Sequence, residues 1–116
     1  MRILVAVQHA DFRKGIDGLA KVCRKELGTN PFTGTVFVFR NRRKTAVKIL
    51  VYDGQGFWLC HKRLSTGRFR WWPESIDDTK SILKAHELHV LLNGGNPSNT
   101  DCTPVWRRID ADNRGK

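Results

Sequence analysis

The fold is set by residues 35–63, which read TVFVFRNRRKTAVKILVYDGQGFWLCHKR. Apolar residues alternate through this stretch, and the polar segments Asn41–Lys44 and Asp53-Gly54 divide it. Such alternation is typical of β-strands, and short polar segments of this kind are typical of the turns that join antiparallel neighbours. With a last strand that stops at Pro73, we expect a four-stranded meander. Its strands are expected at 35–40, 45–53, 57–63 and 68–72.

The segments on either side of the meander complete the expected fold. Residues 2–7 are nearly continuous Ile, Leu and Val, which is typical of a buried strand. A helix is expected after Asp11, whose carboxylate would cap the first turn, and it would end near Gly28. A second helix is expected over 78–92. The order β-α-β-β-β-β-α predicts an α+β fold, in which a mostly antiparallel sheet of four to five strands has its helices packed on one face.

The size and composition of the chain fit one soluble domain. Its 116 residues include 40% hydrophobic residues, which is enough for a core without staples. We expect a single domain over 1–95 and a flexible tail over 96–116, which is rich in Asn, Pro, Ser, Asp and Arg. No apolar run reaches the length of a membrane span, and the three widely spaced cysteines suggest reduced thiols. These features predict a cytoplasmic protein with no membrane partner.

Basic residues are concentrated in one segment. The chain has 21 Lys and Arg residues against 11 Asp and Glu, which gives a formal net charge of +10. Nine of these cations and one acid, Asp53, fall within residues 40–70, so this segment carries +8. Phosphate groups are the obvious external counter-charge for cations held together in this way. The segment therefore favours a nucleic acid as partner, and a solvated basic face that keeps the protein soluble is the alternative.

Aromatic residues follow these cations in the sequence. Phe69 and Trp71 would alternate onto one face of a strand, where burial is the usual fate of large rings. Trp72 would lie on the opposite face beside Arg70, where its ring is open to stacking on an unpaired base.

Motifs of enzymes and metal sites are missing from the sequence. It has no Gly-rich phosphate loop that ends in Lys-Ser/Thr and no Gly-x-Ser-x-Gly turn. The segment His86–His89 reads HELH, whereas the zinc-protease motif needs its histidines four residues apart, and no third ligand is evident. We therefore expect no catalytic residue, no metal and no cofactor.

Several stretches of the sequence are specific enough to indicate a family. They read DFRKGIDGL at 11–19, NPFTGTVFVFRNRR at 30–43, KILVYDGQGF at 48–57, KRL at 62–64 and GRFRW at 67–71. In order and spacing they resemble the TnpB-like accessory proteins of the insertion sequence sixty-six family, which are distinct from the RNA-guided nuclease that shares the TnpB name. The resemblance covers 11–73. It implies a small protein of a bacterial mobile element that is encoded beside a larger transposase and assists transposition, and it implies no catalytic residue.

The charge pattern and the resemblance together predict a non-catalytic accessory protein of a bacterial insertion sequence. It would assist DNA transposition by binding the DNA ends of the element through a basic surface of the sheet. The expected contacts are Arg13, Lys14, Arg40, Arg42, Arg43, Lys44, Lys48, Lys62, Arg63, Arg68, Arg70 and Trp72. The alternative is a protein-interaction module that docks on the transposase or on a sister accessory protein, with Trp58, Trp72 and Trp106 as its anchors.

Overall fold

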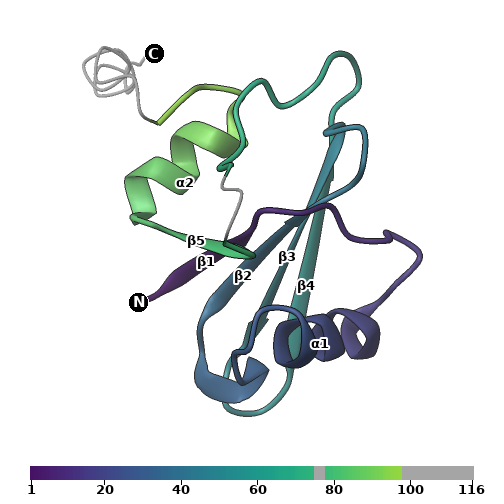
Figure 1. Cartoon of the computed structure of the whole chain (residues 1–116), viewed down its shortest axis with the longest axis vertical. Helices are drawn as coiled ribbons and strands as arrows, with labels where there is room; N and C mark the ends of the chain where they lie inside the picture. Colours follow the sequence, from purple (N-terminus) through teal and green to yellow (C-terminus); the bar gives the residue numbers. More distant parts are fainter. Residues whose placement is uncertain (75–77, 98–116) are drawn as a thin grey trace.

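The computed structural model describes residues 1–74 and 78–97, which form one five-stranded sheet and two α-helices (Figure 1). In chain order the elements are β1 (Ile3–Ala6), α1 (Ile16–Lys25), the 3₁₀ helix η1 (Pro31–Thr33), β2 (Val36–Arg40), β3 (Ala46–Tyr52), β4 (Phe57–Arg63), β5 (Lys80–Leu83) and α2 (Ala85–Leu92). The strands lie in the order β4-β3-β2-β1-β5, so β4 and β5 are the two edges of the sheet.

The expected α+β fold is confirmed, with a sheet of five strands and two α-helices. The sheet is mixed. β2 pairs with β3, β3 with β4, and β1 with β5, all in the antiparallel sense. β1 and β2 are parallel because α1 carries the chain back along the sheet before β2 begins. The strands within 35–63 lie where their alternation predicts them.

The prediction of a fourth meander strand at 68–72 is wrong. This segment forms no strand, and its backbone joins the β2–β3 turn through the Phe69 N–H, which donates to the Lys44 carbonyl at 2.8 Å. The fifth strand of the sheet is β5, which lies inside the segment expected as a helix. It pairs with β1 so that Ile3 lies opposite Leu83 and Ala6 lies opposite Lys80. β1 needs this partner because its residues are all buried, and buried backbone groups must be hydrogen-bonded on both sides.

Both helices begin later than the sequence predicts. α1 starts at Ile16, with Gly15 as its N-cap, because the Asp11 carboxylate binds Arg13 instead of capping the helix. The hydrogen bonds from the Arg13 side chain, and then from its backbone N–H, hold the pKa of Asp11 well below its usual range. α2 starts after Lys84, whose N–H donates to the carboxylate of Glu87 at 2.8 Å. Such a bond satisfies a backbone donor that the helix itself leaves free.

The two helices pack on opposite faces of the sheet, and the prediction that both lie on one face is wrong. Consecutive residues of β1 and β2 alternate between two cores, as the pleat requires. The α1-side core is formed by Leu4, Ala6, Leu19, Val22, Cys23, Leu27, Phe37, Phe39 and Leu50. The α2-side core is formed by Ile3, Val5, Val38, Val47, Phe69, Trp72, Leu83 and Leu91. Strands that are apolar on both faces need cover on both faces, which explains the arrangement.

In the part of the chain that the structure describes, no helix is long and apolar enough to cross a membrane. The tail expected over 96–116 falls almost entirely outside the described residues, and so does Trp106. The prediction of a flexible tail therefore stays a prediction.

Candidate nucleic-acid interface

The turn between β2 and β3 is held by the Asn41 side chain together with two backbone hydrogen bonds, from the Asn41 N–H to the Ala46 carbonyl and from the Lys44 N–H to the Asn41 carbonyl, both at 3.2 Å. The Asn41 Oδ1 atom accepts hydrogen bonds from the backbone N–H groups of Thr45 at 2.9 Å and of Ala46 at 3.1 Å. The Asn41 Nδ2 atom donates to the Thr45 hydroxyl at 2.8 Å. The Asn41 side chain thus supplies the hydrogen-bond partners that the backbone of a neighbouring strand supplies within a ladder. As a result, Arg42 and Arg43 stand exposed at the tip of a fixed turn.

The loop after β4 packs against this turn. The Leu64 N–H donates to the Thr45 carbonyl at 2.9 Å, and the Phe69 N–H donates to the Lys44 carbonyl at 2.8 Å. Phe69 is fully buried, whereas Arg68 and Arg70 on either side of it are exposed. The buried ring therefore anchors a loop whose arginines stand beside the turn.

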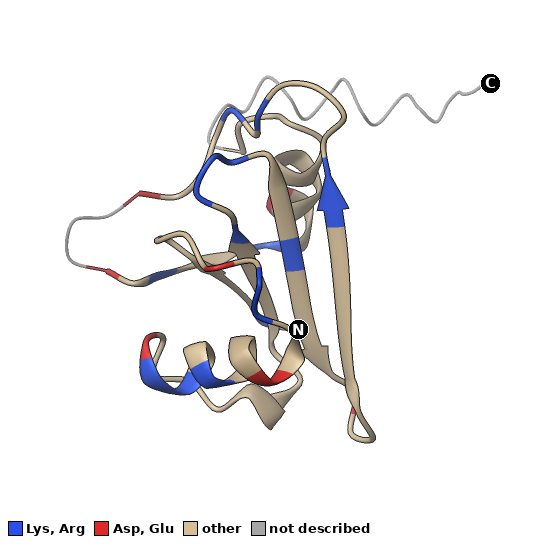
Figure 2. Ribbon diagram, turned by 90° about the vertical axis from the view of Figure 1, so that its right-hand side faces the viewer, with Lys and Arg blue, Asp and Glu red and all other residues tan. Residues whose placement is uncertain are grey.

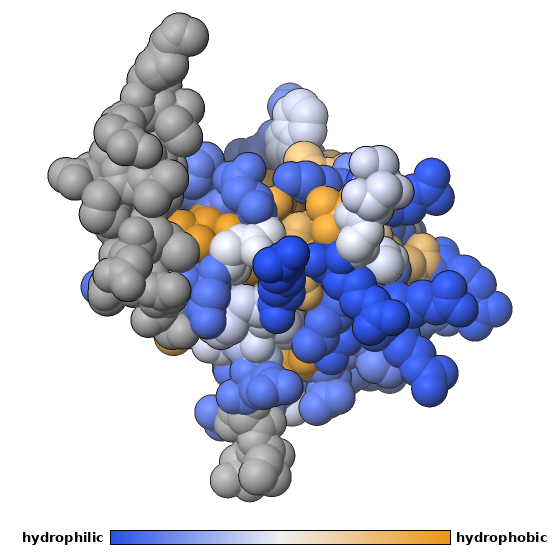
Figure 3. All heavy atoms as spheres, turned by 90° about the horizontal axis from the view of Figure 1, so that it is seen from above, coloured by the Kyte–Doolittle hydropathy of each residue, from blue (hydrophilic) through white to orange (hydrophobic). Residues whose placement is uncertain are grey.

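These segments form a basic end of the sheet. We define the basic end by the exposed arginines of the turn, of the last β4 position and of the loop, together with Lys44: Arg42, Arg43, Lys44, Arg63, Arg68 and Arg70. In Figure 2, the blue ribbon segments of the turn, the loop and the last part of β4 lie at one end of the sheet. Figure 3 looks onto this end and shows strongly hydrophilic side chains gathered there. The turn and the loop after β4 thus bring these cations to one end of the sheet, with a loop in place of the expected fourth strand.

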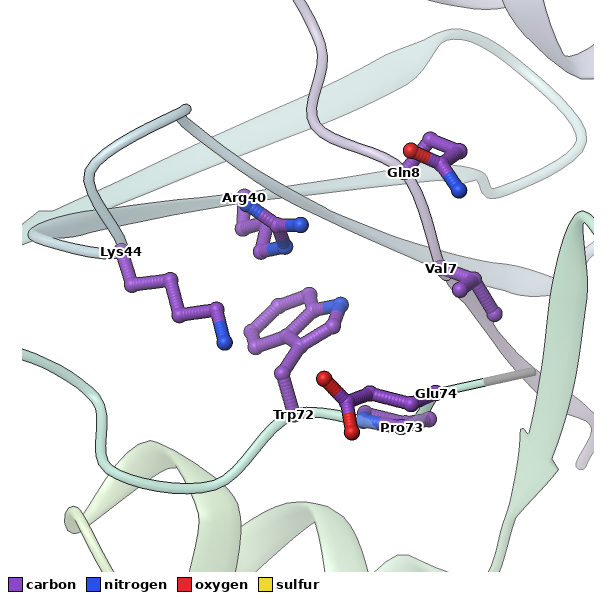
Figure 4. Close-up of a pocket in the computed structure, with 7 residues that line it drawn as sticks. All are labelled: Val7, Gln8, Arg40, Lys44, Trp72, Pro73 and Glu74. Atoms are coloured by element: carbon purple, nitrogen blue, oxygen red, sulfur yellow. The ribbon is translucent and has the colours of Figure 1, made fainter. Parts of the chain in front are cut away.

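An open pocket of about 570 Å³ lies beside the basic end (Figure 4). Its lining residues are Val7, Gln8, Arg40, Lys44, Trp72, Pro73 and Glu74. The side chains of Arg40 and Lys44 both point toward the Trp72 ring. The Arg40 Nη1 atom donates to the Asn41 carbonyl at 3.2 Å, but its Nε atom is buried and has no hydrogen-bond partner among the described residues.

The charge of Arg40 is only partly compensated. Burial lowers the pKa of Arg40 from its usual value, and the nearby charge of Glu74 opposes this change. A guanidinium with a buried, unpaired N–H favours an anionic acceptor, because a buried polar group without a partner is costly. The pocket therefore places one further cation, Arg40, beside the basic end, with its Nε atom buried and not open to a ligand.

Lys48 lies away from this surface. Its side chain is 8% exposed, and its Nζ atom donates to the carbonyl oxygens of Phe12 and Lys14, both at 2.9 Å. The same ammonium lies 5.0 Å from the centre of the Phe12 ring, a cation–π arrangement. Lys48 thus fixes the segment that leads into α1, and the structure does not place it where a phosphate would reach it.

We expect the substitution Lys48→Met to destabilise the protein. Methionine keeps the unbranched stem but leaves the carbonyls of Phe12 and Lys14 without their charged donor, which costs about 2 kcal/mol in free energy of unfolding. Urea denaturation followed by circular dichroism measures this loss. The exposed Lys21→Met serves as the matched control, with an expected change within about 0.5 kcal/mol. Equal stabilities of the two variants would contradict the anchoring role of Lys48.

Other predicted contacts have partners within the protein. The Lys62 Nζ atom donates to the carbonyl of Leu92 at 2.7 Å, so this exposed cation caps the C-terminal end of α2. Arg13 forms an ion pair with Asp11 at 2.8 Å. Arg13 and Lys14 both belong to the segment that leads into α1, and this segment crosses the α1 side of the sheet. None of these three contacts is part of the basic end.

The tryptophans differ in their exposure. Trp72 is 4% exposed, and its Nε1 atom donates to the Ala6 carbonyl at 2.8 Å, so it packs in the α2-side core and not on the surface. The expected stacking role of Trp72 is therefore not supported. Residues 68–72 form no strand, and the Trp72 ring is buried. Trp71, expected in the core, is half-buried. Trp58 is 62% exposed, and its Nε1 atom donates to the Asp53 carboxylate at 2.8 Å.

Sequence reasoning missed two parts of the site. The sequence marks Asn41 only as one polar residue of a turn, although Asn is a residue type whose side chain commonly binds backbone groups there. Glu74, which lines the pocket, lies outside the basic segment, and no motif around it in the sequence indicates a place in the site. Within residues 1–74 and 78–97, no three His, Cys, Asp or Glu side chains lie close enough together to hold a metal ion.

A family model described as "IS66 Orf2 like protein" matches residues 1–101. The chain belongs to the IS66 Orf2-like family. This membership confirms the resemblance seen in the sequence and makes the chain an insertion-sequence-associated protein. The match begins before the first motif quoted above and extends past α2, so it covers the whole described fold.

Two relatives of this IS66 Orf2-like protein come from Sinorhizobium fredii (strain NBRC 101917 / NGR234). The uncharacterized protein y4hO is 37% identical over 94 residues, which cover 81% of the chain and 80% of the relative. The uncharacterized protein y4jC is 33% identical over 107 residues, which cover 92% of the chain and 90% of the relative. Neither the family description nor these names indicate a catalytic activity. No solved structure is significantly similar to the chain.

Proposed function

We propose that this IS66 Orf2-like protein assists transposition as a non-catalytic factor that binds the DNA ends of its element through the basic end of the sheet. One observation carries the proposal. The β2–β3 turn and the loop after β4 are tied together by backbone hydrogen bonds, so that arginines distant in sequence form one surface. Guanidinium groups suit phosphate oxygens because they donate two parallel hydrogen bonds at once.

The surroundings of the basic end support phosphate as its counter-charge. Between residues 40 and 74 the only acids are Asp53 and Glu74. Asp53 lies in the turn at the other end of β3 and β4, where its carboxylate accepts hydrogen bonds from Gln55, Gly56 and Trp58. Glu74 lines one pocket with Arg40 and Lys44 and another with Arg70. Among the described residues no ion pair joins Arg42, Arg43 or Arg68 to an acid. Like charges held this close are stabilised by an external polyanion.

The position of Asp53 also supports a role without catalysis. Hydrogen bonds from the N–H groups of Gly56 and Gln55, and then from Trp58, lower the pKa of Asp53. A carboxylate used in this way holds a turn, and it stands at the end of the sheet opposite the arginines. Nucleases and transposases that use metal ions gather several carboxylates around the reacting phosphate. The DNA-cutting step is accordingly assigned to the separate transposase.

Salt dependence of binding tests the proposal. A labelled duplex that carries the element end is titrated with the full chain at several salt concentrations, beside an unrelated duplex and a single strand. With about five phosphate contacts, the affinity is expected to fall about 10²- to 10³-fold between 50 and 200 mM salt. The element end and the unrelated duplex should give similar slopes, because phosphate contacts carry no sequence information. Absence of binding at low salt, or binding that ignores salt, would overturn the proposal.

A further inference from the structure

β4 is a long and open edge of the sheet. It has seven residues, its second half is exposed on both faces, and within residues 1–74 and 78–97 it pairs only with β3. The opposite edge, β5, has four residues. Figure 2 shows no other described segment alongside the outer edge of β4. An open edge of this length is a template for another strand.

The backbone of β4 presents a regular set of free groups. In the β3–β4 hairpin, the hydrogen-bonded pairs include Asp53 with Gly56 and Thr45 with Leu64. Bonded and non-bonded pairs alternate in an antiparallel ladder, so Trp58, Cys60 and Lys62 direct their backbone groups to β3. The residues between them, such as Leu59 and His61, direct their N–H and C=O groups outward to the open edge.

We propose that β4 pairs with β4 of a second copy of this chain, antiparallel and centred on Cys60. Cys60 is the middle residue of Phe57–Arg63, so this register pairs the two strands over their full length. It sets Leu59 against His61 of the second copy, and both direct their backbone groups toward each other. The sheet then continues through two molecules with ten strands, twice the five of one copy.

The side chains are compatible with this register. In this register Arg63 lies opposite Phe57 of the second copy, so that a cation meets an aromatic ring. The stem of Lys62, whose ammonium binds the Leu92 carbonyl, lies opposite Trp58, and no two cations are paired. Trp58, which is 62% exposed in one copy, becomes covered. Sliding the strands toward their C-terminal ends would instead bring Lys62 to Lys62, which is unfavourable.

The charges at the two ends of β4 are also complementary. The antiparallel arrangement brings the 53–56 turn of each copy, which contains the exposed Asp53, beside the basic end of the other copy. The one acid of residues 40–70 therefore faces the cluster of arginines across the interface. This complementarity selects a second copy of the chain over a strand of unrelated sequence.

A proline substitution tests the pairing through the backbone. His61→Pro removes an N–H that points to the open edge, so the β3–β4 ladder keeps its hydrogen bonds, and proline is tolerated on such an edge. In sedimentation over a concentration series, the wild type is expected to reach the mass of a dimer and His61→Pro to stay at half that mass. His61→Thr keeps the N–H while also losing the imidazole, and it is expected to remain a dimer. A wild type that stays monomeric, or a His61→Pro variant that still dimerises, would overturn the proposal.

Cross-linking through Cys60 tests the register. Directly opposite residues in a non-hydrogen-bonded pair have Cα atoms about 4.5 Å apart, within the range that a disulfide spans. Diamide takes two electrons and two protons from the two Cys60 thiols and is reduced to the hydrazine, so the covalent dimer should form rapidly. Cys23 does not compete, because burial raises the pKa of its thiol to about 12.

Two serine variants complete the test. Cys102→Ser should cross-link like the wild type, because the register involves Cys60 alone. Cys60→Ser should lose the covalent dimer while keeping the sedimenting one. A dimer that cross-links through Cys102, or not at all, would overturn the register. The whole test is made without DNA, so its result is independent of the proposed function.

Discussion

Replacing Arg42, Arg43 and Arg68 together by glutamate is expected to abolish DNA binding. The three side chains are exposed, and they belong to the two segments that meet at the basic end. The change removes about three phosphate contacts and adds three repulsive carboxylates, so the affinity at low salt should fall by more than about 10²-fold. Replacing the same residues by alanine should lower the slope of log affinity against log salt by about three. Both are measured by titration of the labelled duplex.

The matched control carries the same change of charge elsewhere. Three exposed cations serve here: Arg2, which precedes β1, and Lys21 and Lys25, which lie on α1, away from the turn and the loop. Their joint replacement by glutamate alters the net charge equally but should lower the affinity far less. Equal losses in the two triple variants would mean that net charge alone, and not the basic end, governs binding. Circular dichroism of each variant shows whether its fold is retained.

Truncating Trp72 is expected to lower the free energy of unfolding more than the substitution Lys48→Met does. Trp72→Ala removes a large ring from the α2-side core, which costs about 3–5 kcal/mol in free energy of unfolding. The substitution Trp72→Phe keeps most of the apolar surface but leaves the Ala6 carbonyl without the indole N–H that binds it at 2.8 Å. That loss is expected to cost about 1–2 kcal/mol. Urea denaturation of the three proteins gives the comparison.

Trp58 provides the control for this experiment. Trp58→Ala removes the same kind of side chain from a position that is 62% exposed, so the expected loss is below about 1 kcal/mol. The measurement is made at a protein concentration at which sedimentation finds the monomer. If Trp72→Ala were as stable as Trp58→Ala, the indole could not be a core residue, and a surface role for Trp72 would have to be reconsidered.

Local patterns predicted the part of the fold that is made of local contacts. Residues 35–63 alternate through three strands joined by short turns, so each strand finds its partner next to it in the sequence. β5 has no such signal, because its four residues read KSIL and its partner is β1, near the start of the chain. The segment 68–72 alternates like a strand, but Phe69 and Trp72 both enter the α2-side core. No pattern of single residues reveals a pairing of this range.

The candidate site was predictable to the same extent. Arg42 and Arg43 share a turn, and the link between β4 and the following loop brings Arg68 near them, so their convergence follows from sequence neighbours. Lys48 had a signal that charge counting overlooked. It shares a strand face with Ala46 and Leu50, both of which are buried. A lysine between two such residues is more easily explained by an internal partner than by a phosphate.

The pairing of β1 with β5 has a consequence for the order in which the chain folds. To bring Ile3 opposite Leu83, most of the described chain must close into one long loop. The β2–β3 and β3–β4 hairpins, by contrast, close only short loops. We therefore expect the hairpins to form first and β5 to join last. On a ribosome, the open side of β1 stays exposed until residues 80–83 have emerged. That interval is when the nascent chain is most open to aggregation and to chaperones.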